Sequence, residues 1–113
     1  RVARAIFGPD ARRDWKDDHD LSGHDAEGDL WIGEVKSLTW PAGPGRLWAV
    51  LLAALEQAEK HGNRAFAVLV PPKCEPENAL VMVRRCGAPV VMPLRQFRDG
   101  IIGANGGGHD AQA

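Results

Sequence analysis

Three consecutive segments carry three different hydrophobic patterns, and together they restrict the fold more than any other feature of the chain. Residues 30–36, LWIGEVK, fit a strand with Leu30, Ile32, Glu34 and Lys36 on one face and Trp31, Gly33 and Val35 on the other, whereas residues 65–70, AFAVLV, are apolar throughout. Between them, residues 46–60 carry an apolar stripe at helical spacing. An alternating strand, an amphipathic helix and a continuous apolar strand, in this order, predict a sheet with a helix packed across it.

Weaker signals complete the predicted order of elements. Residues 1–7 resemble the last turns of a helix that Gly8 and Pro9 end, and the polar stretch that follows is expected to hold a short strand and a loop. A strand around residues 22–26, a helix end near Gly62 as its C′ residue, strands at 79–85 and 90–93, and a closing helical turn at 94–101 follow. The predicted class is α/β, with a mixed sheet flanked by helices.

Length and composition bound the class of protein. A chain of 113 residues holds one domain, which we place at residues 1–103, before a glycine-rich tail at 104–113 that we expect to be disordered. The longest apolar run, residues 47–55, is too short to cross a membrane, so we predict no membrane partner and a cytoplasmic location. The net charge of −1 argues against binding nucleic acid by bulk positive charge alone, although local basic patches are compatible with it.

Glu34 and Lys36 at the end of the alternating strand are the main candidates for chemistry. They share one strand face with Leu30 and Ile32, although that face is expected to point to the core. Two carboxylates from neighbouring strands, with the backbone carbonyl between Glu34 and Lys36, would supply the hard oxygen ligands that Mg²⁺ or Mn²⁺ prefers. A lysine next to such a site can position and polarise a water for attack on a phosphodiester. The alternative is a solvated ion pair on an edge strand.

The chain resembles the PD-(D/E)XK nuclease superfamily, in particular the small phage and bacterial proteins related to Holliday junction resolvases. The resemblance covers roughly residues 1–102 and rests on HDAEGDLWIGEVK, LLAALEQAEKHG, RAFAVLV and NALVMVRR. It implies the αβββαβ core of restriction endonucleases, hydrolysis of DNA phosphodiester bonds with Mg²⁺ or Mn²⁺, a branched or structured DNA substrate, and a homodimer. Many relatives carry a further Glu on the first helix, and residues 1–7 contain none, so we expect it to be absent or to lie upstream of Arg1.

The same resemblance implies a role for individual residues. Asp25 and Glu34 would be metal ligands, the Val35 carbonyl a third ligand, Lys36 the catalytic lysine, and Gln57 a supporting residue near the site. Asp29 is the rival of Asp25, but it opens the strand of Glu34 and would lie about 16 Å away along that strand. A turn at residues 27–29 would instead fold the strand of Asp25 back alongside Glu34, so Asp25 is the predicted ligand.

Other charged residues have weaker claims. The basic residues that could contact DNA phosphates are Arg12, Arg13, Lys16, Arg64 and Lys73, although scattered surface charges are the commoner explanation. Asp17, Asp18, Asp20 and Asp29 are interpreted as solvated loop charges rather than ligands. The rival to an enzyme is a catalytically inactive module that keeps the nuclease fold and binds DNA or protein, as the missing first-helix Glu would favour.

Overall fold

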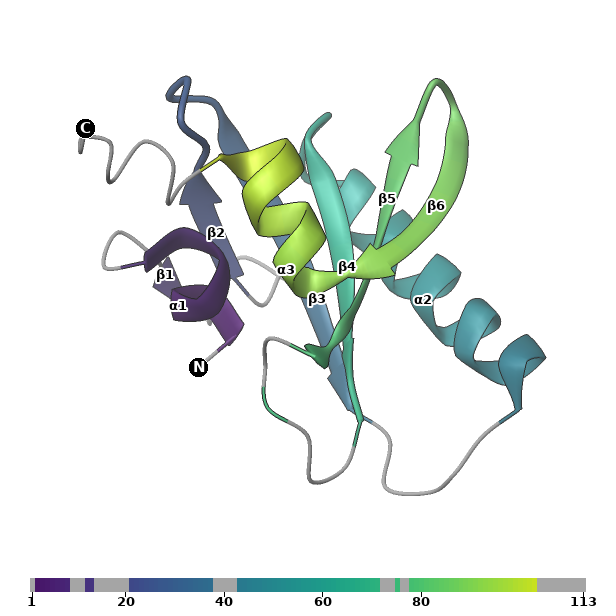
Figure 1. Cartoon of the computed structure of the whole chain (residues 1–113). Coiled ribbons are helices and arrows are strands. Elements are labelled where there is room, and N and C mark those ends of the chain that lie inside the picture. Colours follow the sequence, from purple (N-terminus) through teal and green to yellow (C-terminus); the bar gives the residue numbers. More distant parts are fainter. Residues whose placement is uncertain are drawn as a thin grey trace.

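The computed structural model describes residues 2–8, 12–13, 21–37, 43–71, 75 and 78–103, and its centre is a six-stranded sheet with the strand order β1-β2-β3-β4-β5-β6 (Figure 1). The strands are β1 (Arg12–Arg13), β2 (Leu21–His24), β3 (Leu30–Ser37), β4 (Ala65–Val70), β5 (Leu80–Arg85) and β6 (Ala88–Pro93). The helices are α1 (Val2–Phe7), α2 (Pro44–Glu59) and α3 (Leu94–Phe97), which continues into a π-helical turn, η3 (Arg98–Ile102).

The sheet is mixed because of one connection. β3 and β4 are parallel, with Glu34 opposite Ala67 and Lys36 opposite Leu69, whereas every other neighbouring pair is antiparallel. Parallel neighbours require a crossover, and α2 supplies it. The order of elements as far as β4 is α-β-β-β-α-β, which is the predicted order, and β5, β6 and α3 follow it. The predicted α/β class, a mixed sheet flanked by helices, is confirmed.

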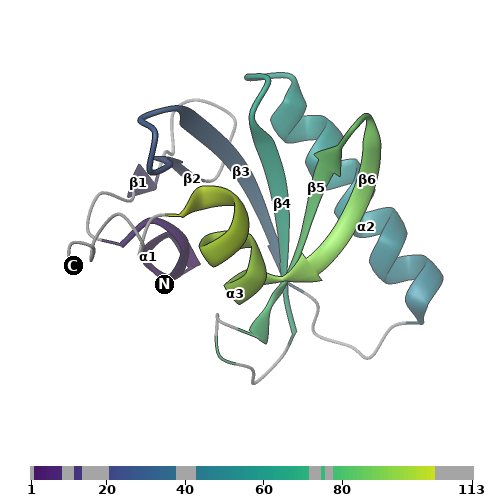
Figure 2. The ribbon, with the colours of Figure 1, turned by 45° about the horizontal axis from the view of Figure 1, so that its top comes forward.

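The sheet separates two layers of the core. α2 covers one face, whereas α1 and α3 cover the other (Figures 1 and 2). Under α2, the buried side chains of the helix pack on Ile32, Ala65, Ala67, Leu69 and Met82 of the central strands. On the other face, four aromatic rings lie together, and the centroids of Phe66 and Phe97 are 4.8 Å apart. The two faces therefore have distinct chemistry, and the face of each strand residue decides which neighbours it meets.

Two strand glycines make room for these rings. A Cβ atom on Gly33 would lie 2.4 Å from Phe66 Cζ, and one on Gly23 would lie 2.3 Å from Phe7 Cγ. Both glycines are therefore required by close packing rather than by backbone conformation. Because Gly23 and Gly33 face the aromatic layer, their strand neighbours Ser22, Ile32 and Glu34 face α2.

The ends of α2 differ from their predicted positions. The helix begins at Pro44, two residues before Arg46, because proline is favoured in the first turn, where its missing N–H has no partner to lose. At the other end, Lys60 is the C-cap with φ −67°, and Gly62 does not take the left-handed conformation of a C′ glycine. Gly62 instead lies against β3, since a Cβ there would approach Ile32 Cδ1 to 3.1 Å. The C′ prediction is wrong.

The C-terminal strands form a tight hairpin. Arg85 pairs with Ala88, and the two residues between them, Cys86 and Gly87, have φ values of 53° and 83°. Positive φ at both positions is the geometry of a type I′ turn, which matches the twist of the strands. The predicted strand at 90–93 is therefore longer than expected and starts at Ala88. The predicted closing helical turn is confirmed as α3 and η3.

None of the helices in the described part of the chain is long and apolar enough to cross a membrane. The glycine-rich tail at residues 104–113 lies outside the described residues, as do Asp17, Asp18 and Asp20.

Candidate functional site

Glu34 lies on β3, in the interior of the sheet, under the helix layer. Its exposed fraction is only 7%, and β3 is paired on both sides, with β2 and with β4. The alternative of a solvated pair on an edge strand is therefore wrong for Glu34. Removing a carboxylate from water costs free energy unless the charge is paired. An apolar residue at the position of Glu34 would therefore stabilise the fold better. A carboxylate at this position indicates a role in function rather than in stability.

Lys36 is the cation paired with this carboxylate. Its Nζ lies 3.8 Å from Glu34 Oε2, and the side chain of Lys36 is 49% exposed while that of Glu34 is 9% exposed. The two residues therefore form a pair with one end in the protein and the other end in solvent. An incoming anionic ligand could reach the ammonium group without entering the core.

Gln57 extends the same region from the helix layer. Glu59 binds Arg84 of β5, with Arg84 Nε donating to Glu59 Oε2 at 2.7 Å, so that flank of α2 faces β5. Residues two apart on a helix point about 200° apart, so Gln57 lies on the opposite flank, toward β3. It is half-buried, and its Oε1 accepts a long hydrogen bond of 3.5 Å from Lys60 Nζ. This helix geometry is compatible with the predicted flank of α2, and a role of Gln57 at the site stays a prediction.

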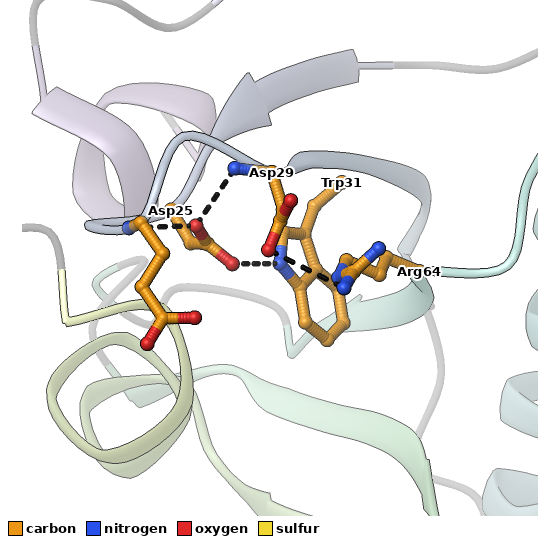
Figure 3. A network of polar contacts seen from close by, with 5 residues as sticks. Asp25, Asp29, Trp31 and Arg64 are labelled. Atoms are coloured by element: carbon orange, nitrogen blue, oxygen red, sulfur yellow. Dashed lines mark hydrogen bonds and ion pairs between the residues drawn. The ribbon is translucent and has the colours of Figure 1, made fainter.

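Asp25 has a different environment from the one predicted. Its Oδ1 accepts hydrogen bonds from the backbone N–H groups of Glu27 and Asp29, both at 2.9 Å, and its Oδ2 accepts one from Trp31 Nε1 at 2.9 Å (Figure 3). Arg64 binds Asp29 in turn, with Nη2 3.3 Å from Oδ2. This network closes the predicted β2–β3 turn, in which Gly28 has a φ of 88°.

The network also sets the charge state of Asp25. Burial by itself raises the pKa of this carboxyl, but the hydrogen bonds from Trp31, Asp29 and Glu27, together with the nearby Arg64 charge, lower it further than burial raises it. The net result is a pKa below the ordinary value of 3.8. Each of these donors stabilises the charged form, so Asp25 is an anion at neutral pH and its two oxygens already have partners.

The structure does not bring Asp25 and Glu34 together. Asp25 follows the end of β2 and bonds Trp31, which packs with the aromatic layer, whereas Glu34 lies on the face of the sheet under α2. His24, next to Asp25, pairs with Leu30, and the four residues from there to Glu34 span roughly 13 Å of strand. The expected fold-back is present, but its register leaves the two carboxylates too far apart to share one ion. The physical reason is that the turn uses Asp25 as its own hydrogen-bond acceptor.

The remaining predicted residues are spread over the sheet. Val35 pairs with Val68, and its side chain packs on the face opposite Glu34. Arg12 and Arg13 form β1 at the sheet edge, and Arg64 precedes β4. Lys16 and Lys73 lie outside the described residues. DNA contacts by these basic residues stay a prediction.

Sequence reasoning missed one polar residue of this region, Ser22 on β2. It is 8% exposed and pairs with Ile32, so it shares the face of Glu34. The signal was available in the segment LSGH, where Leu21 and Gly23 take one face of a strand and leave Ser22 on the other.

The fit of a divalent metal to this region is partial. Among the described residues, no group of three or more His, Cys, Asp or Glu side chains lies close enough to hold an ion. Glu34 is the one carboxylate of the predicted pair that remains at the site, and Lys36 lies beside it. No family model matches the chain, and no curated protein or solved structure matches it either.

Proposed function

We propose that this domain is a metal-dependent endonuclease acting on DNA phosphodiester bonds, with Glu34 and Lys36 at its centre. The observation that carries the proposal is the nearly buried Glu34 carboxylate in the middle of the sheet, paired at 3.8 Å with a lysine that reaches solvent. An acid and a lysine two residues apart on one strand face are also the residues on which the resemblance to the PD-(D/E)XK nucleases rests. The α-β-β-β-α-β order of elements supports the proposal.

In the proposed reaction, water attacks phosphorus and the bond from phosphorus to one bridging oxygen breaks. Lys36 is suited to stabilise the negative charge that develops on the phosphate oxygens, because its ammonium group is accessible to solvent. Mg²⁺ or Mn²⁺ bound at Glu34 would supply Lewis-acid chemistry. The described residues supply one carboxylate for such an ion, that of Glu34. A branched DNA substrate and a homodimer, with two sites for two strands, belong to this proposal.

A second candidate function is a nuclease-like module that binds DNA or protein without cleaving it. The use of both Asp25 oxygens within the turn favours it, because this removes one predicted metal ligand from the site.

Nicking of supercoiled plasmid in the presence of Mg²⁺ or Mn²⁺ distinguishes the two functions. We expect nicking by the parent protein and a loss of two or more orders of magnitude in Lys36→Ala and Glu34→Gln, the scale of losing one electrostatic group. Arg85→Ala and Glu56→Gln, which change exposed charges on β5 and α2, serve as matched controls. Equal rates in parent and Lys36→Ala would refute the catalytic role, and metal-independent DNA binding without nicking would favour the inactive module.

A further inference from the structure

The buried hydroxyl group of Ser22 has no hydrogen-bond partner within the described part of the chain. Ser22 is 8% exposed, and its hydroxyl takes part in no hydrogen bond with any residue that the structure describes. Buried hydroxyl groups are nearly always hydrogen-bonded, since leaving one unpaired costs the free energy of its lost hydration. An alanine here would avoid that cost. The serine is therefore unfavourable for the fold alone, and a ligand that bonds its hydroxyl would account for it.

Ser22 lies beside the proposed active site rather than elsewhere in the core. It is directly opposite Ile32, and Glu34 is the next residue of β3 on the same face. Diagonal neighbours of this kind in an antiparallel pair have Cβ atoms about 7–8 Å apart, a gap that a phosphate group can bridge. On its other side, Ser22 pairs with Arg12 of β1, so a basic residue holds the adjacent register position.

We propose that the Ser22 hydroxyl donates a hydrogen bond to a backbone phosphate oxygen of bound DNA, next to Glu34 and Lys36. The inference rests on the proposed function for the identity of the ligand. A hydroxyl group suits this role because it donates to an anionic oxygen without adding a second charge to a site that already holds Lys36. The three side chains would then approach the phosphate from two neighbouring strands of one sheet face.

The test compares Ser22→Ala with Ser22→Thr, which retains the hydroxyl. Ser37→Ala is the matched control, because Ser37 is an exposed serine of β3 on the opposite face. The melting temperature is measured without ligand, the affinity for a fluorescent four-way DNA junction is measured in Ca²⁺ so that turnover is not needed, and plasmid nicking is measured in Mg²⁺.

Ser22→Ala is expected to melt at the same temperature as the parent protein or higher, while DNA affinity or nicking falls about 10- to 100-fold, the effect of one hydrogen bond to a charged group. Ser22→Thr should stay within a few-fold of the parent, and Ser37→Ala should match it. A lower melting temperature of Ser22→Ala with unchanged DNA binding and nicking would instead make the hydroxyl structural and overturn the inference.

The same measurements separate this inference from the proposed function. If the parent protein nicks DNA and Ser22→Ala binds and nicks equally well, the inference alone is wrong. If the parent binds the junction without nicking and Ser22→Ala binds it more weakly, the endonuclease function is wrong while the phosphate contact stands. A parent protein that neither binds nor nicks DNA overturns both.

Discussion

Asp25 offers the sharpest test of the structure, because its predicted role as a metal ligand and its observed role in the turn lead to opposite results. Two of its three hydrogen bonds, from the Asp29 N–H and from Trp31 Nε1, are partly buried at 2.9 Å, whereas the bond from the Glu27 N–H is exposed. Water replaces the exposed bond readily. At about 1 kcal/mol for each partly buried bond, Asp25→Ala should cost about 2 kcal/mol of unfolding free energy.

A loss of this size lowers the melting temperature by about 8 °C in a domain of this length. The assay is urea unfolding at pH 7 of the parent, Asp25→Ala, Trp31→Phe and the double variant. Trp31→Phe removes the indole N–H from the network. The four proteins form a double-mutant cycle that isolates the hydrogen bond between Trp31 and Asp25, and we expect a coupling energy of about 1 kcal/mol between the two substitutions. Asp99→Ala is the control, because Asp99 is an exposed acid paired with Arg98 and should change stability by less than about 0.5 kcal/mol.

The pH dependence supplies a second check with a defined sign. The folded-state pKa of Asp25 is lowered, so the unfolded chain takes up the proton first as the pH falls. The contribution of Asp25 to stability is therefore complete above its ordinary pKa of 3.8 and is lost as the pH falls below that value. The difference between parent and Asp25→Ala should be constant well above pH 3.8 and should shrink as the pH falls through and below that value. The reasoning would be refuted if the losses of unfolding free energy in the two single variants simply added in the double variant. It would also be refuted if the stability difference between parent and Asp25→Ala grew as the pH falls.

Metal binding completes the comparison. Mn²⁺ affinity, measured by calorimetry, should fall in Glu34→Gln and stay unchanged in Asp25→Asn, because the two carboxylates lie on different faces of the sheet. Asp20, whose structure is outside the described residues, directly precedes Leu21 in the sequence, and Leu21 pairs with Gly33 next to Glu34. Asp20→Asn is therefore included as a comparison variant. A loss of affinity in Asp25→Asn alone would contradict the arrangement described above.

Two further substitutions test the helix flank and the aromatic layer. Gln57→Leu should leave the melting temperature within a few degrees, since the one hydrogen bond of its side chain to a described residue is the long 3.5 Å bond from Lys60. The same substitution should reduce nicking, and a large loss of stability with normal nicking would make Gln57 structural. Gly33→Ala should cost about 1–3 kcal/mol in urea unfolding, because the new Cβ would lie 2.4 Å from the Phe66 ring. Gly45→Ala, in α2 with open space around it, should be neutral or slightly stabilising, and equal effects at both glycines would contradict the packing argument.

The sequence by itself determined the elements and their class. Local patterns are enough for this, because the alternation in β3, the stripe on α2 and the continuous apolar run of β4 each follow from the repeat of one element. The turn before β3 was predictable for the same reason, since glycine and acidic residues favour tight turns. The positions of Glu34 and Lys36 on one strand face also follow from local alternation, and the structure pairs them.

Only the tertiary structure decided which side chains meet. The choice of Asp25 over Asp29 depended on a register that the sequence does not specify, and the structure uses Asp25 to close its own turn through Trp31, a residue on the next strand. Gly62 was expected to cap a helix, but it makes room for Ile32. Ser22 became notable only when its burial and its place opposite Ile32 were known. Each of these depends on contacts between elements, and such contacts are set by the packing of the whole chain rather than by the pattern of any one segment.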